Sequence, residues 1–185
     1  MAVHTIRIGD LQRHLPVVPV GDDVSIAFLK LYGDLELLDV ATAALADRLT
    51  GDADVIVGPE SGGILLAHLL ARRTNRRCVV VRKKVRPNMA APIRVPVRTI
   101  GTAGEQELVL GEDDAAVIAG RRVALVDEVV SSGGTLRALQ ALVGAAGGEV
   151  VQTLAVATEG ERRPSVTSLV HLPVLTREPV DGAAG

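Results

Sequence analysis

Short apolar runs, separated by polar and glycine-rich segments, follow one another along this chain. The runs Val55–Val57, Val79–Val81 and Val123–Val126 are rich in β-branched residues and have polar or charged residues close by. Such runs are typical of strands that are buried on both faces of a parallel sheet. Apolar residues recur at helical spacing in residues 34–49 and again from Ile64 onward. The pattern predicts an α/β fold with a mostly parallel central sheet and flanking helices.

Two segments lack a regular pattern. Residues 1–33 contain prolines and glycines, so we expect a small irregular subdomain with short strands in Thr5–Ile8 and Val24–Leu31. Residues 87–107 also contain prolines and glycines, although Ile93–Ile100 alternates enough for a hairpin arm. Because a long loop in a compact domain is usually functional, we interpret 87–107 as a flexible loop that closes over a site as a lid.

The whole chain is expected to form one domain. Its 185 residues suffice for a hydrophobic core, and no internal repeat or linker interrupts residues 1–185. Residues 177–185 are expected to fray. The other predicted elements are a strand over Gln106–Leu110, a helical turn over Asp113–Ala119, a helix over 135–146, a strand over Glu149–Ala157 and a last strand within Val166–Leu175.

Composition argues against several classes of function. The net charge of −2 gives no electrostatic reason to expect nucleic acid or a membrane as a partner, and aromatic residues make up only 1%. The single cysteine, Cys78, excludes an intrachain disulfide or a cysteine-based zinc site, and the four histidines lack metal-ligand spacing. No targeting segment or long apolar run is visible, so we expect a cytoplasmic protein.

The stretch that follows the third apolar run carries the strongest chemical signal. Asp127 and Glu128 come directly after Val123–Val126, and Ser131–Thr135 then leads into a predicted helix. A helix N-terminus offers unpaired amides and a partial positive charge, glycines allow close approach, and hydroxyl groups add donors. The residues predicted to form this phosphate-monoester pocket are Ser131, Ser132, Gly133, Gly134 and Thr135.

Asp127 and Glu128 add a second function to this stretch. Carboxylates accept hydrogen bonds in pairs, so they suit the vicinal hydroxyls of a ribose, or Mg²⁺ held directly or through water. A strand that ends in two acids also occurs in P-loop ATPases, but no Gly-x-x-x-x-Gly-Lys-Ser/Thr loop is present. The combination therefore predicts a phosphorylated sugar as the ligand.

A second glycine-rich turn and a basic run follow the other two apolar runs. Gly58–Gly63 comes after Val55–Val57, and Arg82–Lys84 comes after Val79–Val81. The carboxyl ends of parallel strands meet at one edge of a sheet, where ligands bind. A charge run is usually a solvated face, but this position favours a role in phosphate binding. Two anion sites on one edge suit a ligand with phosphates at two places.

These residues carry a resemblance to a known family. Val123–Thr135 resembles the phosphoribosyl pyrophosphate (PRPP) motif of type I phosphoribosyltransferases, with Glu128 where Asp is usual and Ser132 where Thr is frequent. Gly58–Gly63 is similar to the pyrophosphate loop of adenine phosphoribosyltransferases. The resemblance implies the type I phosphoribosyltransferase-like fold, with residues 1–33 as a hood over a base.

The resemblance also implies the roles of residues. Asp127 and Glu128 would be catalytic. They would also contact, indirectly, the Mg²⁺ that is bound together with PRPP. Ser131–Thr135 would hold the 5′-phosphate of PRPP. Val129 and Phe28, or Tyr32 in place of Phe28, would contact the base. A homodimer is implied, in which the basic run often serves a neighbouring subunit's site. The implied pyrophosphate-binding residues are Glu60, Ser61, Gly62, Arg82, Lys83 and Lys84.

The implied reaction is purine salvage: transfer of the 5-phosphoribosyl group from PRPP to adenine or a 6-oxopurine, with release of pyrophosphate. Adenine phosphoribosyltransferases carry a Glu-Tyr-Gly-Thr-like segment in the lid, and Thr99–Thr102 has neither the Glu nor the Tyr. The acceptor therefore stays open. The alternatives are a non-purine acceptor, or a regulator of the same fold that senses PRPP without catalysis.

Overall fold

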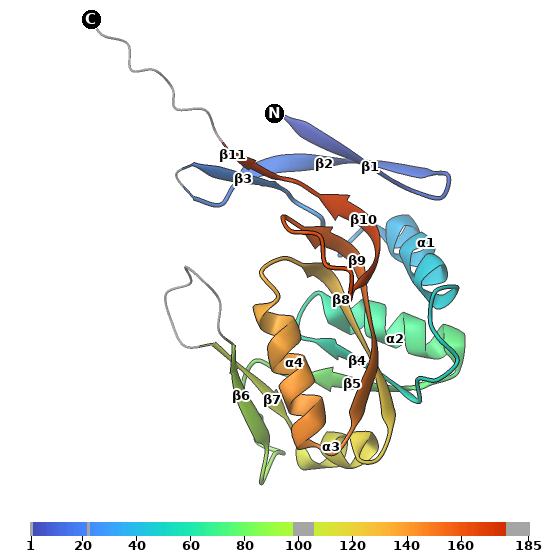
Figure 1. The fold of residues 1–185 in the computed structure, drawn as a ribbon, viewed down its shortest axis with the longest axis vertical. Helices are drawn as coiled ribbons and strands as arrows, with labels where there is room; N and C mark the ends of the chain where they lie inside the picture. The colour runs from blue at the N-terminus through green and yellow to red at the C-terminus, as the bar shows by residue number, and fades with distance from the viewer. Residues whose placement is uncertain (1, 22, 98–105, 177–185) are drawn as a thin grey trace, which may run out of the picture.

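A five-stranded parallel sheet forms the centre of the molecule (Figure 1). The computed structural model describes residues 2–21, 23–97 and 106–176. The strand order is β10-β9-β8-β4-β5, and every neighbouring pair is parallel, as the apolar runs predict. The strands are β4 (Val55–Pro59), β5 (Arg77–Val81), β8 (Arg122–Val130), β9 (Glu149–Glu159) and β10 (Thr167–Leu172).

Helices cover both faces of this sheet because successive side chains of each strand alternate between the faces. On one face Ile56, Ala124 and Val126 share a core with α1 (Leu35–Ala46) and α2 (Gly63–Thr74). On the other face Val55, Val57, Val123 and Leu125 share a second core with α4 (Gly134–Ala145) and with Ile118 of α3 (Glu112–Ile118). None of the helices in the described ranges is long and apolar enough to cross a membrane.

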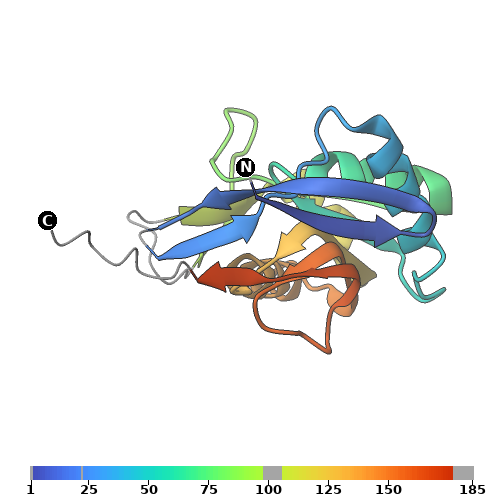
Figure 2. The same ribbon diagram turned by 90° about the horizontal axis from the view of Figure 1, so that it is seen from above.

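The N-terminal segment is more regular than the sequence indicates. It forms an antiparallel sheet, in the order β1-β2-β3-β11, which lies above the central sheet in Figure 1 and in front of it in Figure 2. The short strands expected in Thr5–Ile8 and Val24–Leu31 correspond to β1 and β3. The expectation of an otherwise irregular segment was wrong, because β2 continues through Pro16 and ends only at Pro19. Pro16 stands opposite Val3, and its carbonyl oxygen accepts a hydrogen bond from the Phe28 N–H. Its strands are β1 (Val3–Ile8), β2 (Leu11–Pro19), β3 (Val24–Ala27) and β11 (Val174–Thr176).

The last predicted strand divides into two strands of different sheets. β10 ends at Leu172, and β11 begins at Val174, on the far side of Pro173. Proline has no N–H to donate, so it favours a break in a strand ladder. Val174 pairs with Ile26 of β3, so the C-terminal strand completes the N-terminal sheet. Apolar alternation alone could not separate these two strands.

A β-hairpin stands beside the central sheet. Its strands β6 (Ile93–Val97) and β7 (Gln106–Leu110) are antiparallel and pack against α4. Arg94 donates two hydrogen bonds to Glu107 across the hairpin, at 2.9 Å and 3.0 Å. The predicted lid 87–107 therefore contains strand residues on both sides of its middle part. Its middle, residues 98–105, lies outside the described residues, and the closing motion stays a prediction.

Candidate active site

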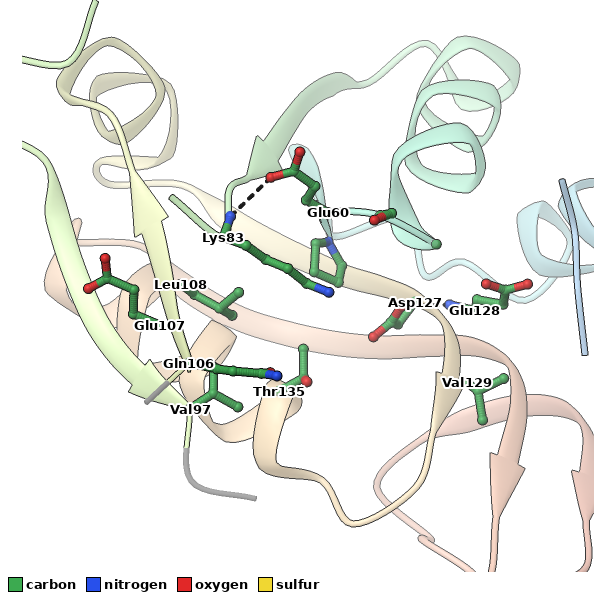
Figure 3. A pocket seen from close by; sticks show the side chains of 13 residues that line it. Glu60, Lys83, Val97, Gln106, Glu107, Leu108, Asp127, Glu128, Val129 and Thr135 are labelled. Atoms are coloured by element: carbon green, nitrogen blue, oxygen red, sulfur yellow. Dashed lines mark hydrogen bonds between the residues drawn. The ribbon is translucent and has the colours of Figure 1, made fainter. Parts of the chain in front are cut away.

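Three loops of interest meet at one edge of the central sheet. β8, β4 and β5 are neighbours, so the segments that follow them lie side by side. This confirms the arrangement expected from the three apolar runs. A cavity of about 210 Å³ lies between these loops and β7 (Figure 3). Residues that line it include Glu60, Gly62, Lys83, Gln106, Asp127 and Glu128.

The two acids lie inside a strand, not after it. β8 continues to Val130, so Asp127 and Glu128 alternate along it. The Glu128 N–H donates to Asp127 Oδ1 at 2.8 Å, and the Leu31 N–H donates to Glu128 Oε1 at 2.8 Å. The contact with Leu31 anchors the chain that enters from the N-terminal sheet. Both carboxylates line the cavity, so they lie between the two glycine-rich loops.

Burial perturbs both carboxylates. It raises the pKa of Asp127 to about 7; the nearby Glu128 charge adds to this rise, while the Glu128 N–H and Lys83 oppose it. Burial also raises the pKa of Glu128, against the opposing hydrogen bond from Leu31. In Figure 3 the Lys83 side chain extends toward Asp127. Perturbed acids in a cavity are typical of functional sites because function needs a charge where folding disfavours it.

The raised pKa of Asp127 has a consequence for stability. The folded protein binds this proton more tightly than the unfolded chain, whose pKa is near 3.8, so ionisation of Asp127 removes stability between about pH 4 and pH 7. Asp127→Asn should therefore be more stable than the wild type at pH 8, by on the order of 3 kcal/mol, and should lose most of this advantage at pH 4.

Urea unfolding of both proteins at pH 4, 6 and 8 measures this difference. Asp39→Asn, at an exposed position of α1, is the matched control and should follow the wild type at each pH. A free-energy difference between wild type and Asp127→Asn that is the same at pH 4 and pH 8 would contradict the raised pKa.

The predicted phosphate loop joins β8 to α4. Ser131, Ser132 and Gly133 form the turn, and α4 begins at Gly134. Gly133 has a φ of +76°, a left-handed conformation that favours glycine. All five predicted residues, Ser131–Thr135, line a hollow of about 70 Å³ that also contacts Asp127 and Val129. The structure thus brings the predicted residues together, and their role stays a prediction.

Two arginines hold this loop from outside, and sequence reasoning missed both. Arg163, in the loop between β9 and β10, donates from Nε to the Ser131 carbonyl oxygen at 2.9 Å. Arg137 of α4 donates from Nη1 to the Ser132 carbonyl oxygen at 3.3 Å. Arg163 lies far along the chain in a polar segment, so only the fold shows that it contacts the loop.

Glu60 is turned toward basic groups of the neighbouring loop. Its carboxylate accepts hydrogen bonds from the Lys83 N–H and from Arg86 Nη2, both at 3.1 Å, and lies 3.9 Å from Arg82 Nη1. The hydrogen bond from Lys83, with the charges of Arg86 and Arg82, lowers the pKa of Glu60. A carboxylate would by itself repel an anion bound by this loop, but the negative charge of Glu60 is offset by these basic neighbours.

Of the basic run, only Lys83 lines the cavity. The Arg82 side chain lies near Glu60, and the Arg82 backbone pairs with Val109 through two hydrogen bonds, of 2.8 Å and 2.7 Å. Lys84 is exposed and does not line the cavity. The structure thus gives the cavity one of the three cations that were predicted to bind pyrophosphate.

The residues that were predicted to contact the base differ in their position relative to the cavity. Val129 lines both the cavity and the hollow beside it. Phe28 is 47% exposed and lines neither. Tyr32 donates its hydroxyl hydrogen to the Ser61 carbonyl oxygen, which ties it to the Glu60–Gly62 loop. Gln106 of β7 also lines the cavity; sequence reasoning placed it in a strand but gave it no role.

The carboxylates suit a metal that is shared with a ligand. Among the described residues, no three His, Cys, Asp or Glu side chains gather closely enough to hold an ion by themselves. Mg²⁺ is usually bound by one or two carboxylates together with phosphate oxygens of a substrate and water. Asp127 and Glu128, which line the cavity together, fit that donor set.

Comparison with known proteins agrees with the resemblance seen in the sequence. Residues 34–171 match the family model described as "Phosphoribosyl transferase domain". An adenine phosphoribosyltransferase of Mycobacterium tuberculosis is 33% identical over 167 residues, which cover 90% of this chain and 76% of that protein. The HGPRTase-like protein 3 of Haloterrigena turkmenica is 33% identical over 147 residues, 76% of this chain and 75% of that protein.

Solved structures show the same fold. The crystal structure of adenine phosphoribosyltransferase from Thermoanaerobacter pseudethanolicus superimposes with a TM-score of 0.69 at 24% sequence identity. The superposition covers 85% of this chain and 95% of that chain. The type I phosphoribosyltransferase fold expected from the resemblance is thereby confirmed.

Proposed function

The chain belongs to the phosphoribosyltransferase family and is a pentosyl-transferring enzyme, and we propose that it transfers the 5-phosphoribosyl group of PRPP to adenine. The products are pyrophosphate and adenosine monophosphate. The observation that carries this proposal is the cavity between the loops after β8 and β4, with Asp127 and Glu128 between them. Two anion-binding loops with carboxylates between them suit a sugar that carries phosphate at both ends.

The donor would lie across the edge of the sheet. Its 5′-phosphate would occupy the Ser131–Thr135 loop, where the N-terminus of α4 favours negative charge. Its ribose hydroxyls would donate to Asp127 and Glu128. Its pyrophosphate would lie against the Ser61–Gly62 backbone, with Lys83 as the cation in the cavity. Held at both ends, the sugar would present C1′ to the base.

The reaction would break the bond between C1′ and a pyrophosphate oxygen and form a bond between C1′ and a ring nitrogen of the base. The bonding electrons leave with pyrophosphate, and the base loses a proton. Positive charge develops on the sugar, where the carboxylates of Asp127 and Glu128 stabilise it. Lys83 stabilises the charge on the leaving group. These residues therefore act mainly by position and charge.

We propose that Mg²⁺ enters together with PRPP. Asp127 and Glu128 are the residues that would hold it, directly or through water. When bound, it would neutralise part of the pyrophosphate charge. We further propose a single domain over residues 1–185 and a cytoplasmic location. We also propose a homodimer, in which Arg82 and Lys84, which do not line this chain's cavity, serve the neighbouring site.

The choice of base rests on the relatives. The Mycobacterium tuberculosis relative is named an adenine enzyme, and the Haloterrigena turkmenica relative is named HGPRTase-like. A 6-oxopurine is therefore the second candidate. The segment Thr99–Thr102, which lacks the Glu and Tyr typical of adenine enzymes, lies outside the described residues.

An acceptor panel tests this proposal. With PRPP and Mg²⁺, we expect pyrophosphate release with adenine to be at least about tenfold faster than with hypoxanthine, guanine, xanthine, orotate or uracil, because one base pocket discriminates by hydrogen-bond pattern. Mass spectrometry should identify adenosine monophosphate. If pyrophosphate release is faster with hypoxanthine or guanine than with adenine, the acceptor is a 6-oxopurine and not adenine. PRPP binding without release for any base would contradict the proposal and favour a sensor.

A further inference from the structure

A backbone loop that binds phosphate needs its amides turned inward and its carbonyl oxygens turned outward. Each outward carbonyl oxygen then needs a partner of its own, or the loop is free to turn it back toward the anion. In the Ser131–Thr135 loop, the carbonyl oxygens of Ser131 and Ser132 both accept hydrogen bonds from arginines. In the part of the chain that the structure describes, the N–H groups of Ser132 and Gly133 have no backbone acceptor.

Arg163 packs closely against this loop. Its Nε donates to the Ser131 carbonyl oxygen at 2.9 Å. Its Nη1 and Cζ atoms lie 3.2 Å and 3.3 Å from the point where a Cβ on Gly133 would stand, and Arg137 Nη1 lies 3.2 Å from the same point. Two guanidinium groups therefore meet on the outer side of Gly133, where any side chain would disturb them.

The charges of these arginines remain available to the loop. Within residues 2–21, 23–97 and 106–176, neither Arg163 nor Arg137 forms an ion pair with a carboxylate. Their positive charges add to that of the α4 N-terminus, and a phosphate monoester carries up to two negative charges. The loop itself, Ser-Ser-Gly-Gly-Thr, has no cation.

We propose that Arg163 is a positioning residue that holds the Ser131–Thr135 loop open for the 5′-phosphate, with Arg137 in the same role at the next carbonyl. The inference rests on the proposed function, which assigns this loop to the 5′-phosphate. Arg163 belongs to the loop between β9 and β10, so it links a segment outside the recognised motif to binding of the donor. The pyrophosphate end of the donor lies at another loop and is independent of it.

Arg162 supplies a matched control from the same segment. It lines a different and shallow hollow, together with His4 and Arg7, between β1 and β10. Arg162→Gln and Arg163→Gln make the same chemical change one residue apart. Arg163→Gln should raise the KM for PRPP about tenfold and change kcat less than twofold, whereas Arg162→Gln should change neither. The KM of Arg163→Lys for PRPP should lie between those of Arg163→Gln and the wild type, because lysine keeps the positive charge but lacks the planar guanidinium group with its several donors.

Calorimetry with two ligands separates positioning from general damage. Ribose 5-phosphate should bind Arg163→Gln about tenfold more weakly than the wild type, while inorganic pyrophosphate should bind equally well. Unchanged binding of ribose 5-phosphate would overturn the inference. Equal weakening of both ligands, with a lower Tm, would also overturn it. Failure of the proposed function would instead appear as absence of turnover in the wild type, and the ribose 5-phosphate comparison needs no turnover.

Discussion

The double variant Asp127→Asn/Glu128→Gln should lose turnover by roughly a thousandfold, because charge that stabilises a transition state is worth about that much in a closed site. Both side chains line the cavity, and both lie between the Gly58–Gly63 and Ser131–Thr135 loops. The neutral amides still accept hydrogen bonds, so they can still contact a ribose hydroxyl. They no longer supply the negative charge that the developing sugar cation needs.

The fold of this double variant should survive. The amide introduced at position 127 would still accept the hydrogen bond from the backbone N–H of position 128. The amide introduced at position 128 would still accept that of Leu31, since each amide keeps one oxygen. Removal of a carboxylate whose pKa is raised by burial should even stabilise the protein at neutral pH. Loss of activity with an unchanged or higher Tm is therefore the expected combination.

Pyrophosphate release and thermal unfolding measure the two effects on the same samples. Glu149→Gln, at the exposed start of β9 and at the opposite end of the sheet, is the matched control and should keep full turnover. Turnover of the double variant within tenfold of the wild type would contradict the role of these acids. A cooperative unfolding transition confirms that the comparison concerns folded protein.

Gly58→Ala should damage stability and activity together. A Cβ at this position would stand 2.7 Å from the Gly63 carbonyl oxygen and 2.8 Å from the Ala67 Cβ, where strand β4 meets helix α2. Neither neighbour is a flexible side-chain end, so the backbone must shift. Overpacking of this kind costs about 3 kcal/mol. The shift displaces the Glu60–Gly62 loop, and a misplacement of about 1 Å costs on the order of a hundredfold in rate.

Gly144→Ala is the matched control for this change. Gly144 lies within α4, and a Cβ there would have no neighbour within 4 Å. Alanine favours a helix over glycine by about 1 kcal/mol, so this variant should be slightly more stable and fully active. Urea unfolding and pyrophosphate release measure both variants. A Gly58→Ala protein as stable and as active as the wild type would show that β4 and α2 can separate without effect.

Much of the central sheet could be predicted because its signals are local. The β-branched runs at Val55, Val79 and Val123 each became a strand of the parallel sheet. Those at Val55 and Val123 are buried, whereas β5 lies at the edge of the sheet and Val80 is only partly buried. The rule that parallel strands end at one edge then placed the Gly58–Gly63 and Ser131–Thr135 segments together, and the strand order bears this out. The order of the strands in the sheet could not be derived from the apolar runs, because the runs resemble one another in sequence.

The N-terminal sheet and the support of the site depend on contacts between distant residues. β11 joins β3 from the other end of the chain, and Pro16 within β2 hides the alternation that would reveal a strand. Arg163 and Tyr32 contact backbone carbonyl oxygens, which leave no pattern in sequence. The raised pKa of Asp127 comes from burial, and burial is set by the whole fold.

The cavity between the loops after β8 and β4 is proposed to be the place where a phosphoribosyl group is joined to a purine base. The most direct test is the stoichiometry of products from purified protein, PRPP, Mg²⁺ and adenine. We predict one pyrophosphate for each adenosine monophosphate formed, and no pyrophosphate when adenine is left out. Equal release of pyrophosphate without any base would show hydrolysis of PRPP and would contradict the transfer that the site is proposed to perform.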